Sequence, residues 1–377
     1  MRILLVITSL GVGGAERLVI SLADRFTAAG HEVCLAWFHS EAELKPLDAR
    51  VSLVNLGISK NPLALIKGLW RLRKLILEFK PDVVNSHLVH ANILTRLLRL
   101  ITPMPRLISS AHNTNEEGRF RMLAYRFTDR LANISTNVSD EAVQAFIDQG
   151  ALLPGRMMTI HNGIDTDNFK FGYDARVAIR NELGLSDSQP VLLAVGRFWE
   201  AKDYPNLFHA LAKLQGWGYS PKLIIAGDGP LREKLVELSI KLKINNQVYF
   251  LGVRHDVLGL MSAGDIFVLS SAWEGLPMVV LEAMACQRLV VATDCGGVRG
   301  LVGESGLLVP PQDSGALAIA LKQALNLESN QRVELGKNAR KRVEKLYSLE
   351  AASRKWLRLY RGEPVEDTAQ PTSTMES

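Results

Sequence analysis

The chain has 377 residues, of which 47% are hydrophobic and 22% are charged, and its formal net charge is +5. At about 150 residues per domain this length predicts two domains and excludes a mini-protein, and the composition excludes a wholly disordered chain. Three scattered cysteines, Cys34, Cys286 and Cys295, are too few for a disulfide framework or a four-ligand zinc site, and they favour a reducing, cytoplasmic setting. No apolar run approaches the roughly 18 residues that cross a bilayer, so we expect a chain that does not span a membrane.

Strand-like and helix-like segments alternate along the first half of the chain. The first strand, residues 3–8, is followed by a glycine turn and a helix over 15–29, whereas a signal peptide would be followed by a small-residue cleavage site. Its continuous apolar character is typical of a parallel sheet that helices cover on both faces. Further strands are expected at 33–38, 82–85, 106–110 and 131–136.

The same alternation restarts in the second half. Strands are expected at 191–195, 222–226, 248–251, 266–270 and 289–293, with helices near 206–214, 231–242 and 277–285. The fold class is therefore α/β, with two doubly wound Rossmann-like domains facing a central cleft, and ligands are expected at the carboxyl ends of the strands.

The domain boundary is placed in residues 163–184, which have no clear period. We predict an N-terminal domain over 1–168 and a C-terminal domain over 169–345. A final helix over 346–362 is expected to pack back on the first domain. The tail over 363–377 is rich in Ser, Thr, Pro and acidic residues and is expected to be disordered.

Basic residues are concentrated in the first half, where residues 58–130 contain 13 basic and 5 acidic side chains, which predicts an anionic partner. A helix over 64–80 has an apolar core stripe formed by Leu65, Leu69, Leu72, Ile76 and Phe79. On its other faces lie basic residues and an aromatic one, Lys67, Arg71, Arg73, Lys74 and Trp70. This combination suits an anionic membrane surface, and a solvated helix face is the alternative.

A glycine turn, Gly11 to Gly14, joins the first strand to the first helix. The amides of Gly13 and Gly14 are suited to approach a phosphate at the positive end of that helix, and a mere tight turn is the alternative. Glu16 stands where the third glycine of a G-x-G-x-x-G motif would be, which disfavours a dinucleotide-dependent oxidoreductase.

Two cations follow the strand over 191–195. Arg197 and Lys202 leave the end of that strand on the wall of the expected cleft. They suit a pyrophosphate, because a cationic clamp stabilises the charge that develops on a departing phosphate. A solvated arginine and lysine in a loop form the alternative.

Two glutamates flank the start of the helix over 277–285, in which Pro277 fits the first turn. Glu274 precedes this helix, and the amides of Gly275 and Leu276 are expected to be free for sugar hydroxyls or phosphate oxygens. Glu282 lies on an otherwise apolar helix and therefore needs a partner. A ribose diol would supply one, and an internal salt bridge is the alternative.

These segments together carry a resemblance. The series 13–17 (GGAER), 162–165 (NGID), 196–197 (GR) with Lys202, 227–230 (GDGP), and Glu274 with Glu282 resembles glycosyltransferase family 4, retaining enzymes of the GT-B fold, over nearly the whole chain. The resemblance implies a nucleotide-sugar donor bound mainly by the C-terminal domain and an acceptor bound mainly by the N-terminal domain. It also implies that no metal or other cofactor is required.

The resemblance also implies roles for single residues. Arg197 and Lys202 match the ligands of the donor diphosphate, Glu282 the ribose ligand and Glu274 the acid beside the transferred sugar. His112, after the strand over 106–110, matches a histidine that touches the donor sugar, although a lone histidine is often structural. The resemblance also places Gly13 and Gly14 near the diphosphate and Arg254 at the nucleotide base. Gly227, in the glycine-rich segment 227–230, is a further donor-binding match.

One further motif points to a different chemistry. Asp165-Thr166-Asp167 spells D-x-D, the metal-binding signature of the other major glycosyltransferase fold. It follows Asn162-Gly163 in the expected interdomain connector, and the cationic pair already supplies the charge of a metal ion. We therefore interpret it as a structural turn in which Asp165 caps locally.

These observations predict a retaining glycosyltransferase that moves a hexose or N-acetylhexosamine from a UDP-sugar to a lipid-diphosphate-linked saccharide. The resemblance places it in bacterial surface-polysaccharide assembly, such as lipopolysaccharide O-antigen, capsule or exopolysaccharide, on the inner face of the cytoplasmic membrane as a peripheral protein. No nucleic-acid partner is expected. Two alternatives stay open, a UDP-N-acetylhexosamine 2-epimerase of the same fold and a GDP-mannose-dependent mannosyltransferase.

Overall fold

A computed structural model describes the chain except for residues 12, 40, 60, 114–117 and 366–377, and it divides into two compact units. The first unit runs from Met1 to Gly163 and includes the helix that begins at Leu349, and the second runs from Ile164 to Ser348. The boundaries thus differ by a few residues from those predicted at 168 and 345. Ile164 belongs to the second unit because its amide donates to the carbonyl oxygen of Tyr347 at 2.9 Å.

The first unit contains a seven-stranded sheet with the order β3-β2-β1-β4-β5-β6-β7, in which every pairing is parallel. The expected strands are confirmed within a few residues, and β3 and β7 were not predicted. β3 has mostly exposed side chains and β7 has three residues, so neither carries a buried apolar run. The strands are β1 (Arg2–Ile7), β2 (Glu32–Trp37), β3 (Ser52–Asn55), β4 (Val83–His87), β5 (Leu107–Ser110), β6 (Ile134–Asn137) and β7 (Met157–Thr159).

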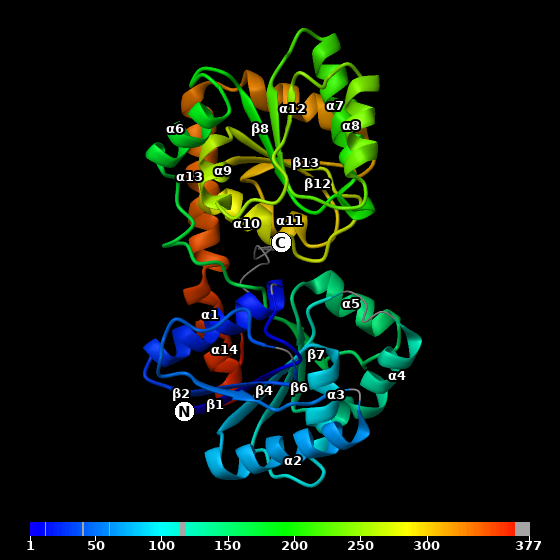
Figure 1. The fold of residues 1–377 in the computed structure, drawn as a ribbon, viewed down its shortest axis with the longest axis vertical. Coiled ribbons are helices and arrows are strands. Elements are labelled where there is room, and N and C mark those ends of the chain that lie inside the picture. Colours follow the sequence, from blue (N-terminus) through cyan, green and yellow to red (C-terminus); the bar gives the residue numbers. More distant parts are fainter. Residues whose placement is uncertain (12, 40, 60, 114–117, 366–377) are drawn as a thin grey trace, which may run out of the picture. The chain divides into compact units, whose positions relative to one another are not determined.

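Helices cover both faces of this sheet (Figure 1). α1 (Gly14–Ala28) and α14 (Leu349–Arg361) contribute to one apolar cluster, and α2 (Pro62–Phe79) and α3 (Val89–Leu98) to the other. The return of the final helix to the first unit is therefore confirmed, and Trp356 of α14 is 2% exposed. The remaining helices of this unit are α4 (Arg119–Thr128), the 3-10 turn η1 (Asp129–Leu131) and α5 (Asp140–Asp148).

The second unit repeats the arrangement with a six-stranded parallel sheet in the order β10-β9-β8-β11-β12-β13. Five of these strands were expected, and three of them have the predicted bounds. The strands are β8 (Val191–Val195), β9 (Lys222–Ala226), β10 (Val248–Phe250), β11 (Ile266–Leu269), β12 (Leu289–Thr293) and β13 (Gly306–Val309).

One helix of the second unit contradicts the sequence analysis. α6 (Tyr173–Glu182) lies in the stretch that was predicted to lack a period. Its buried face contains Arg180, which is 2% exposed and donates to the carbonyl oxygen of Ala263 and to a carboxylate oxygen of Asp265 at 3.0 and 2.8 Å. A buried, paired arginine interrupts the apolar periodicity on which the prediction depended.

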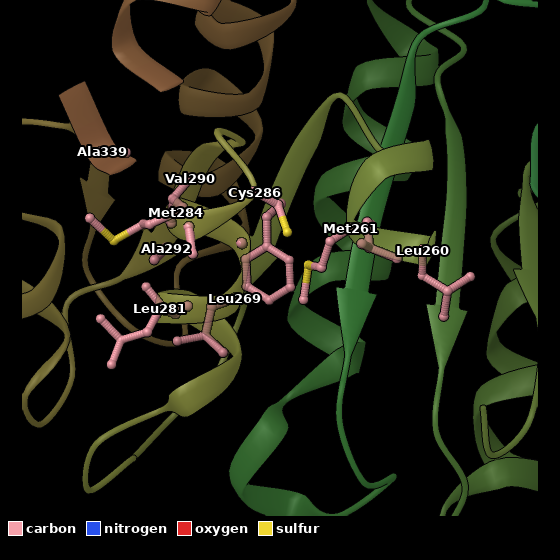
Figure 2. Packing of buried hydrophobic residues seen from close by; sticks show 14 of the residues in the cluster. Leu260, Met261, Leu269, Leu281, Met284, Cys286, Val290, Ala292 and Ala339 are labelled. Atoms are coloured by element: carbon pink, nitrogen blue, oxygen red, sulfur yellow. The ribbon is translucent and has the colours of Figure 1, made fainter. Parts of the chain in front are cut away.

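The other helices of the second unit include α10 (Met278–Ala285), which packs against the sheet through Leu281 and Met284 (Figure 2). These side chains, with Leu269 and Ala292 from the strands beneath, form part of the buried cluster on that face. The remaining elements are the 3-10 turn η2 (Glu200–Lys202), α7 (Tyr204–Gly216), α8 (Arg232–Lys241), α9 (Val257–Ala263), α11 (Val298–Val302), α12 (Ser314–Asn326) and α13 (Ser329–Leu346).

The strand order reverses between β1 and β4 in the first sheet and between β8 and β11 in the second. Ligands of open parallel sheets bind at the carboxyl ends of strands at such switch points. No described helix has both the length and the apolar character needed to cross a membrane. The expected disordered tail lies, from residue 366, outside the described residues.

Candidate functional site

The second unit brings three polar side chains together at the switch point between β8 and β11. Nζ of Lys202, in η2 after β8, lies 2.6 Å from Oε1 of Glu274, in the loop after β11. The same carboxylate oxygen accepts a hydrogen bond from the hydroxyl of Ser271 at 2.6 Å. The side chains of Lys202 and Glu274 are 21% and 13% exposed, so both groups remain accessible to a ligand. The structure therefore unites two of the predicted site residues.

Arg197 lies at the start of the same loop, directly after β8. Its side chain is exposed, and its guanidinium carbon lies 5.2 Å from the centroid of the Trp199 ring. Such stacking holds a guanidinium in place while leaving its N–H groups available. Arg197 and Lys202 thus supply two cations on one loop.

Glycines allow the loops around this cluster to approach one another. A Cβ atom at Gly227, after β9, would collide with the carbonyl oxygen of Gly196, and the Gly227 amide donates to the carbonyl oxygen of Gly252 at 2.8 Å. A Cβ atom at Gly296, after β12, would collide with the carbonyl oxygen of Glu274. Gly227 is therefore required for packing, whether or not it also touches a ligand, and Gly296 helps to hold Glu274.

The amino end of α10 lies next to Glu274. Pro277 precedes the helix and gives its amides no side-chain cap, and within the described part of the chain the amides of Gly275 and Leu276 donate no hydrogen bond. Glu282 is half-buried in the middle of α10. Free amides and the positive end of a helix favour an anion or a sugar hydroxyl at this place.

The first unit has a similar helix end at its own switch point. Gly13 is the residue before α1, and Gly14 is the first residue of that helix. Because Gly13 has no side chain, the first turn of this 15-residue helix has no side-chain cap. A Cβ atom at Gly13 would collide with a carboxylate oxygen of Glu16, so this carboxylate lies at the helix end, and the phosphate contact stays a prediction.

Two histidines lie beside each other at the carboxyl ends of β4 and β5. Nδ1 of His87 and Nε2 of His112 are 3.1 Å apart, so one ring nitrogen donates to the other. Burial lowers the pKa of His112 to about 4 and lowers the pKa of His87 well below its usual value. Both rings are therefore neutral at pH 7, and the ring of Trp356 packs against His87 with centroids 6.1 Å apart.

The guanidinium of Arg254 is paired with two carboxylates of the second unit. It donates to both carboxylate oxygens of Glu182 at 2.6 and 3.1 Å and to those of Asp256 at 2.7 and 2.6 Å. Two carboxylates thus occupy the groups that were predicted to contact a nucleotide base. A contact with a nucleotide base at this position would therefore come from the backbone of the loop after β10, and the base contact of Arg254 stays a prediction.

The D-x-D segment forms the capping turn that was predicted for it. Oδ1 of Asp165 accepts hydrogen bonds from the amides of Asp167 and Asn168 at 3.0 and 3.2 Å. In the part of the chain that the structure describes, no three His, Cys, Asp or Glu side chains are grouped as a metal site.

Helix α2 presents the two faces that were predicted. Leu72 and Ile76 are buried, and Leu65, Leu69 and Phe79 pack partly against them. On the outer side, Trp70 is 58% exposed and the guanidinium carbon of Arg73 lies 5.2 Å from its ring centroid. Lys67, Arg71 and Lys74 are all exposed and line this face together, and Arg71 also donates to the carbonyl oxygen of Leu56 at 3.2 Å.

Comparisons with known families agree with these two units. A family model described as "Glycosyltransferase Family 4" matches residues 12–168, and one described as "Glycosyl transferases group 1" matches residues 176–342. The solved structure of Anabaena HepE in complex with UDP superposes with a TM-score of 0.81 at 22% identity, covering 96% of this chain and all of that one.

Curated relatives are similar over most of their length. A Campylobacter jejuni α-1,4-N-acetyl-D-galactosaminyltransferase, named for an undecaprenol diphosphate-linked saccharide, is 28% identical over 95% of this chain and 98% of its own. An Escherichia coli enzyme named as a UDP-Gal:α-D-GlcNAc-diphosphoundecaprenol α-1,3-galactosyltransferase is 27% identical over 75% of this chain and 79% of its own.

Three residues of these sites were not found from the sequence. His87 lies two residues beyond the predicted end of its strand, and Ser271 directly follows a predicted one. Gly296 lies in a Gly-Gly pair after β12, and its φ of +53° requires a glycine-like conformation. Polar residues at strand ends were a usable signal for Ser271 and His87, but the contact of His87 with His112 joins two separate strand ends.

Proposed function

Because this chain belongs to the family 4, group 1 glycosyltransferases, we propose that it transfers a hexose or N-acetylhexosamine from a UDP-sugar, with retention of anomeric configuration, to a lipid-diphosphate-linked saccharide. The observation that carries this proposal is the cluster of Lys202, Ser271 and Glu274 at the strand ends of the second sheet, next to Arg197. The names of the curated relatives, which specify acceptors on undecaprenol diphosphate, support the choice of acceptor.

Each side chain of the cluster has a distinct task in this proposal. The Lys202 ammonium has three N–H groups, and one is used by Glu274, so two remain for the donor diphosphate. Arg197 supplies a second cation, and together they stabilise the charge on the departing diphosphate without a metal ion. Glu274, held by Lys202 and Ser271, positions the transferred sugar, and Glu282 accepts hydrogen bonds from the ribose hydroxyls.

The first unit holds two further groups suited to this substrate class. They are the amides around Gly14 at the start of α1, which suit a phosphate, and His112, which is a neutral hydrogen-bonding group suited to a sugar hydroxyl. The bond between the anomeric carbon and the diphosphate breaks, the acceptor hydroxyl attacks on the same face, and its proton passes to an oxygen of the departing diphosphate. The lipid-linked acceptor implies work at the cytoplasmic membrane surface as a peripheral protein of surface-polysaccharide assembly.

The decisive experiment incubates the purified protein with UDP-hexoses, UDP-N-acetylhexosamines or GDP-mannose, each with and without a lipid-diphosphate saccharide. We expect acceptor-dependent release of UDP and a lengthened lipid-linked product with an α-linkage. Isomerised UDP-sugar formed without acceptor would instead identify an epimerase, and transfer from GDP-mannose alone would identify a mannosyltransferase. Lys202→Ala serves as the control that separates site chemistry from a contaminating activity.

A further inference from the structure

Helix α4 has an apolar stripe on its solvent side. Its inner side packs through Met122 and Tyr125, which are 4% and 0% exposed. On the outer side Phe120, Leu123 and Phe127 are 89%, 50% and 80% exposed, and their spacing places them on one face of the helix. An apolar stripe of this size facing water indicates an interaction surface and is not needed for the core.

A basic groove adjoins this stripe. It is lined by side chains of α4, of η1 and of the turn that precedes β7, namely Arg126, Phe127, Asp129, Arg130, Leu152, Leu153 and Arg156. Asp129 is already paired within the protein, with Arg156 at 2.8 Å and with the buried Arg96 at 3.6 Å. Arg126 and Arg130 are exposed and, among the described residues, have no carboxylate partner. The groove is therefore left with a net positive charge.

The stripe continues toward α2. The last turn of α3 and the turn that follows it contain Leu97, Leu100 and Ile101, which are 44%, 66% and 62% exposed. The carbonyl oxygen of Ile101 accepts a hydrogen bond from Arg73 of α2 at 3.4 Å, and Arg99 donates to the carbonyl oxygen of Leu131 at 2.8 Å. Figure 1 shows α3 between α2 and α4. Exposed apolar and basic side chains thus extend over three neighbouring helices.

We propose that the outer face of α4, formed by Phe120, Leu123, Arg126, Phe127 and Arg130, is an insertion surface for an anionic lipid membrane. The apolar side chains enter the boundary between headgroups and acyl chains, and the two arginines bind lipid phosphates in the plane of the headgroups. The proposal rests on the proposed function in one respect, because a transferase with a lipid-linked acceptor must reach the membrane.

Charge favours a membrane over a second copy of this chain. In a two-fold symmetric dimer the same patch would face itself, so Arg126 and Arg130 would approach their own counterparts. Like charges at such a contact oppose association, whereas an anionic bilayer presents apolar chains beneath a layer of phosphates. The pattern of the α4 face matches that layering.

The test measures co-sedimentation of the full chain with vesicles of phosphatidylcholine alone and with added phosphatidylglycerol. The double variant Leu123→Ser with Phe127→Ser removes apolar groups, and Arg126→Glu with Arg130→Glu reverses the charge. Matched controls lie on α8 of the second unit, where Ile240 is 58% exposed and Lys234 and Lys241 are also exposed. They are Ile240→Ser, and Lys234→Glu with Lys241→Glu.

We expect wild type and both controls to bind the anionic vesicles, and each α4 variant to bind at least tenfold more weakly at low salt. Equal binding of the α4 variants and wild type, or no wild-type binding at low salt, would overturn the proposal. A wild-type dimer that the serine variant dissociates, without vesicle binding, would assign the surface to a second copy. The rise in melting temperature with UDP-sugar is measured in parallel. No rise in the wild type would contradict the proposed function without bearing on the membrane surface.

Discussion

The ammonium of Lys202 donates to the carboxylate of Glu274 at 2.6 Å, although 72 residues separate them along the chain. The pair lies where β8 and β11 end, and Ser271 donates to the same carboxylate oxygen. This arrangement keeps both charges in place before a ligand binds, which reduces the reorganisation that a charged leaving group would require.

Replacement of Lys202 by alanine is expected to lower turnover by roughly 10²–10³-fold, because it removes a preorganised cation from the departing diphosphate. It also removes the only cation that a described ion pair gives to Glu274. Steady-state rates of the purified variant measure the effect, and its melting temperature serves as the control for folding. A variant with wild-type turnover would refute the diphosphate role.

Arg197→Ala is expected to lower turnover to a similar extent, roughly 10²–10³-fold, while leaving the fold intact. The side chain is exposed and its described contact is the stacking on Trp199, so little packing is lost. Arg197→Lys is the informative companion, because a lysine retains charge but cannot donate two parallel hydrogen bonds. Full activity of the alanine variant would exclude Arg197 from the site.

Gly296→Ala is expected to reduce both stability and activity. The new Cβ atom would collide with the carbonyl oxygen of Glu274, and the φ of +53° at this position disfavours alanine. The control is Gly300→Ala on α11, where a Cβ atom meets nothing within 4 Å. Thermal unfolding and turnover of the two variants should differ clearly, and equal behaviour would show that the Glu274 loop tolerates displacement.

Acidification is expected to destabilise the first unit through its histidine pair. Burial lowers the pKa of folded His112 to about 4 from its ordinary value of 6.5, so the unfolded chain binds more protons between these pH values. The free energy of unfolding should therefore fall as the pH drops from 6.5 toward 4, by up to about 3 kcal/mol from this residue. The pKa of His87 is shifted in the same direction.

Unfolding by denaturant at several pH values measures this dependence. The double variant His87→Gln with His112→Asn should lose most of the slope between pH 6.5 and 4, whereas His209→Asn, on the exposed side of α7, should retain it. An unchanged slope in the double variant would contradict the assignment of neutral, buried rings.

Activity is expected to persist in excess EDTA. Arg197 and Lys202 supply positive charge at the proposed diphosphate position, and Oδ1 of Asp165 accepts hydrogen bonds from the backbone amides of Asp167 and Asn168. The measurement is a single assay with and without the chelator. Loss of activity with EDTA and its return with Mg²⁺ or Mn²⁺ would assign a metal to this reaction.

The local alternation of apolar strands and helices was enough to predict both parallel sheets, because a buried parallel strand needs a continuous apolar run. β8, β9 and β12 have the predicted bounds for this reason. The strand ends also indicated Arg197, Lys202 and Glu274, since charged residues in the loops that follow buried strands lie at the edge where such sheets bind ligands.

Only the tertiary structure decided which side chains satisfy one another. Arg180 in α6 pairs with Asp265, Arg254 pairs with Glu182, and His87 meets His112, each across many residues of chain. A pattern read along the sequence carries propensity and periodicity, whereas hydrogen bonds and ion pairs depend on distances that exist only after the sheets have formed. The apolar stripe of α4 illustrates the same limit, because its inward and outward faces can be told apart only when the surrounding helices are in place.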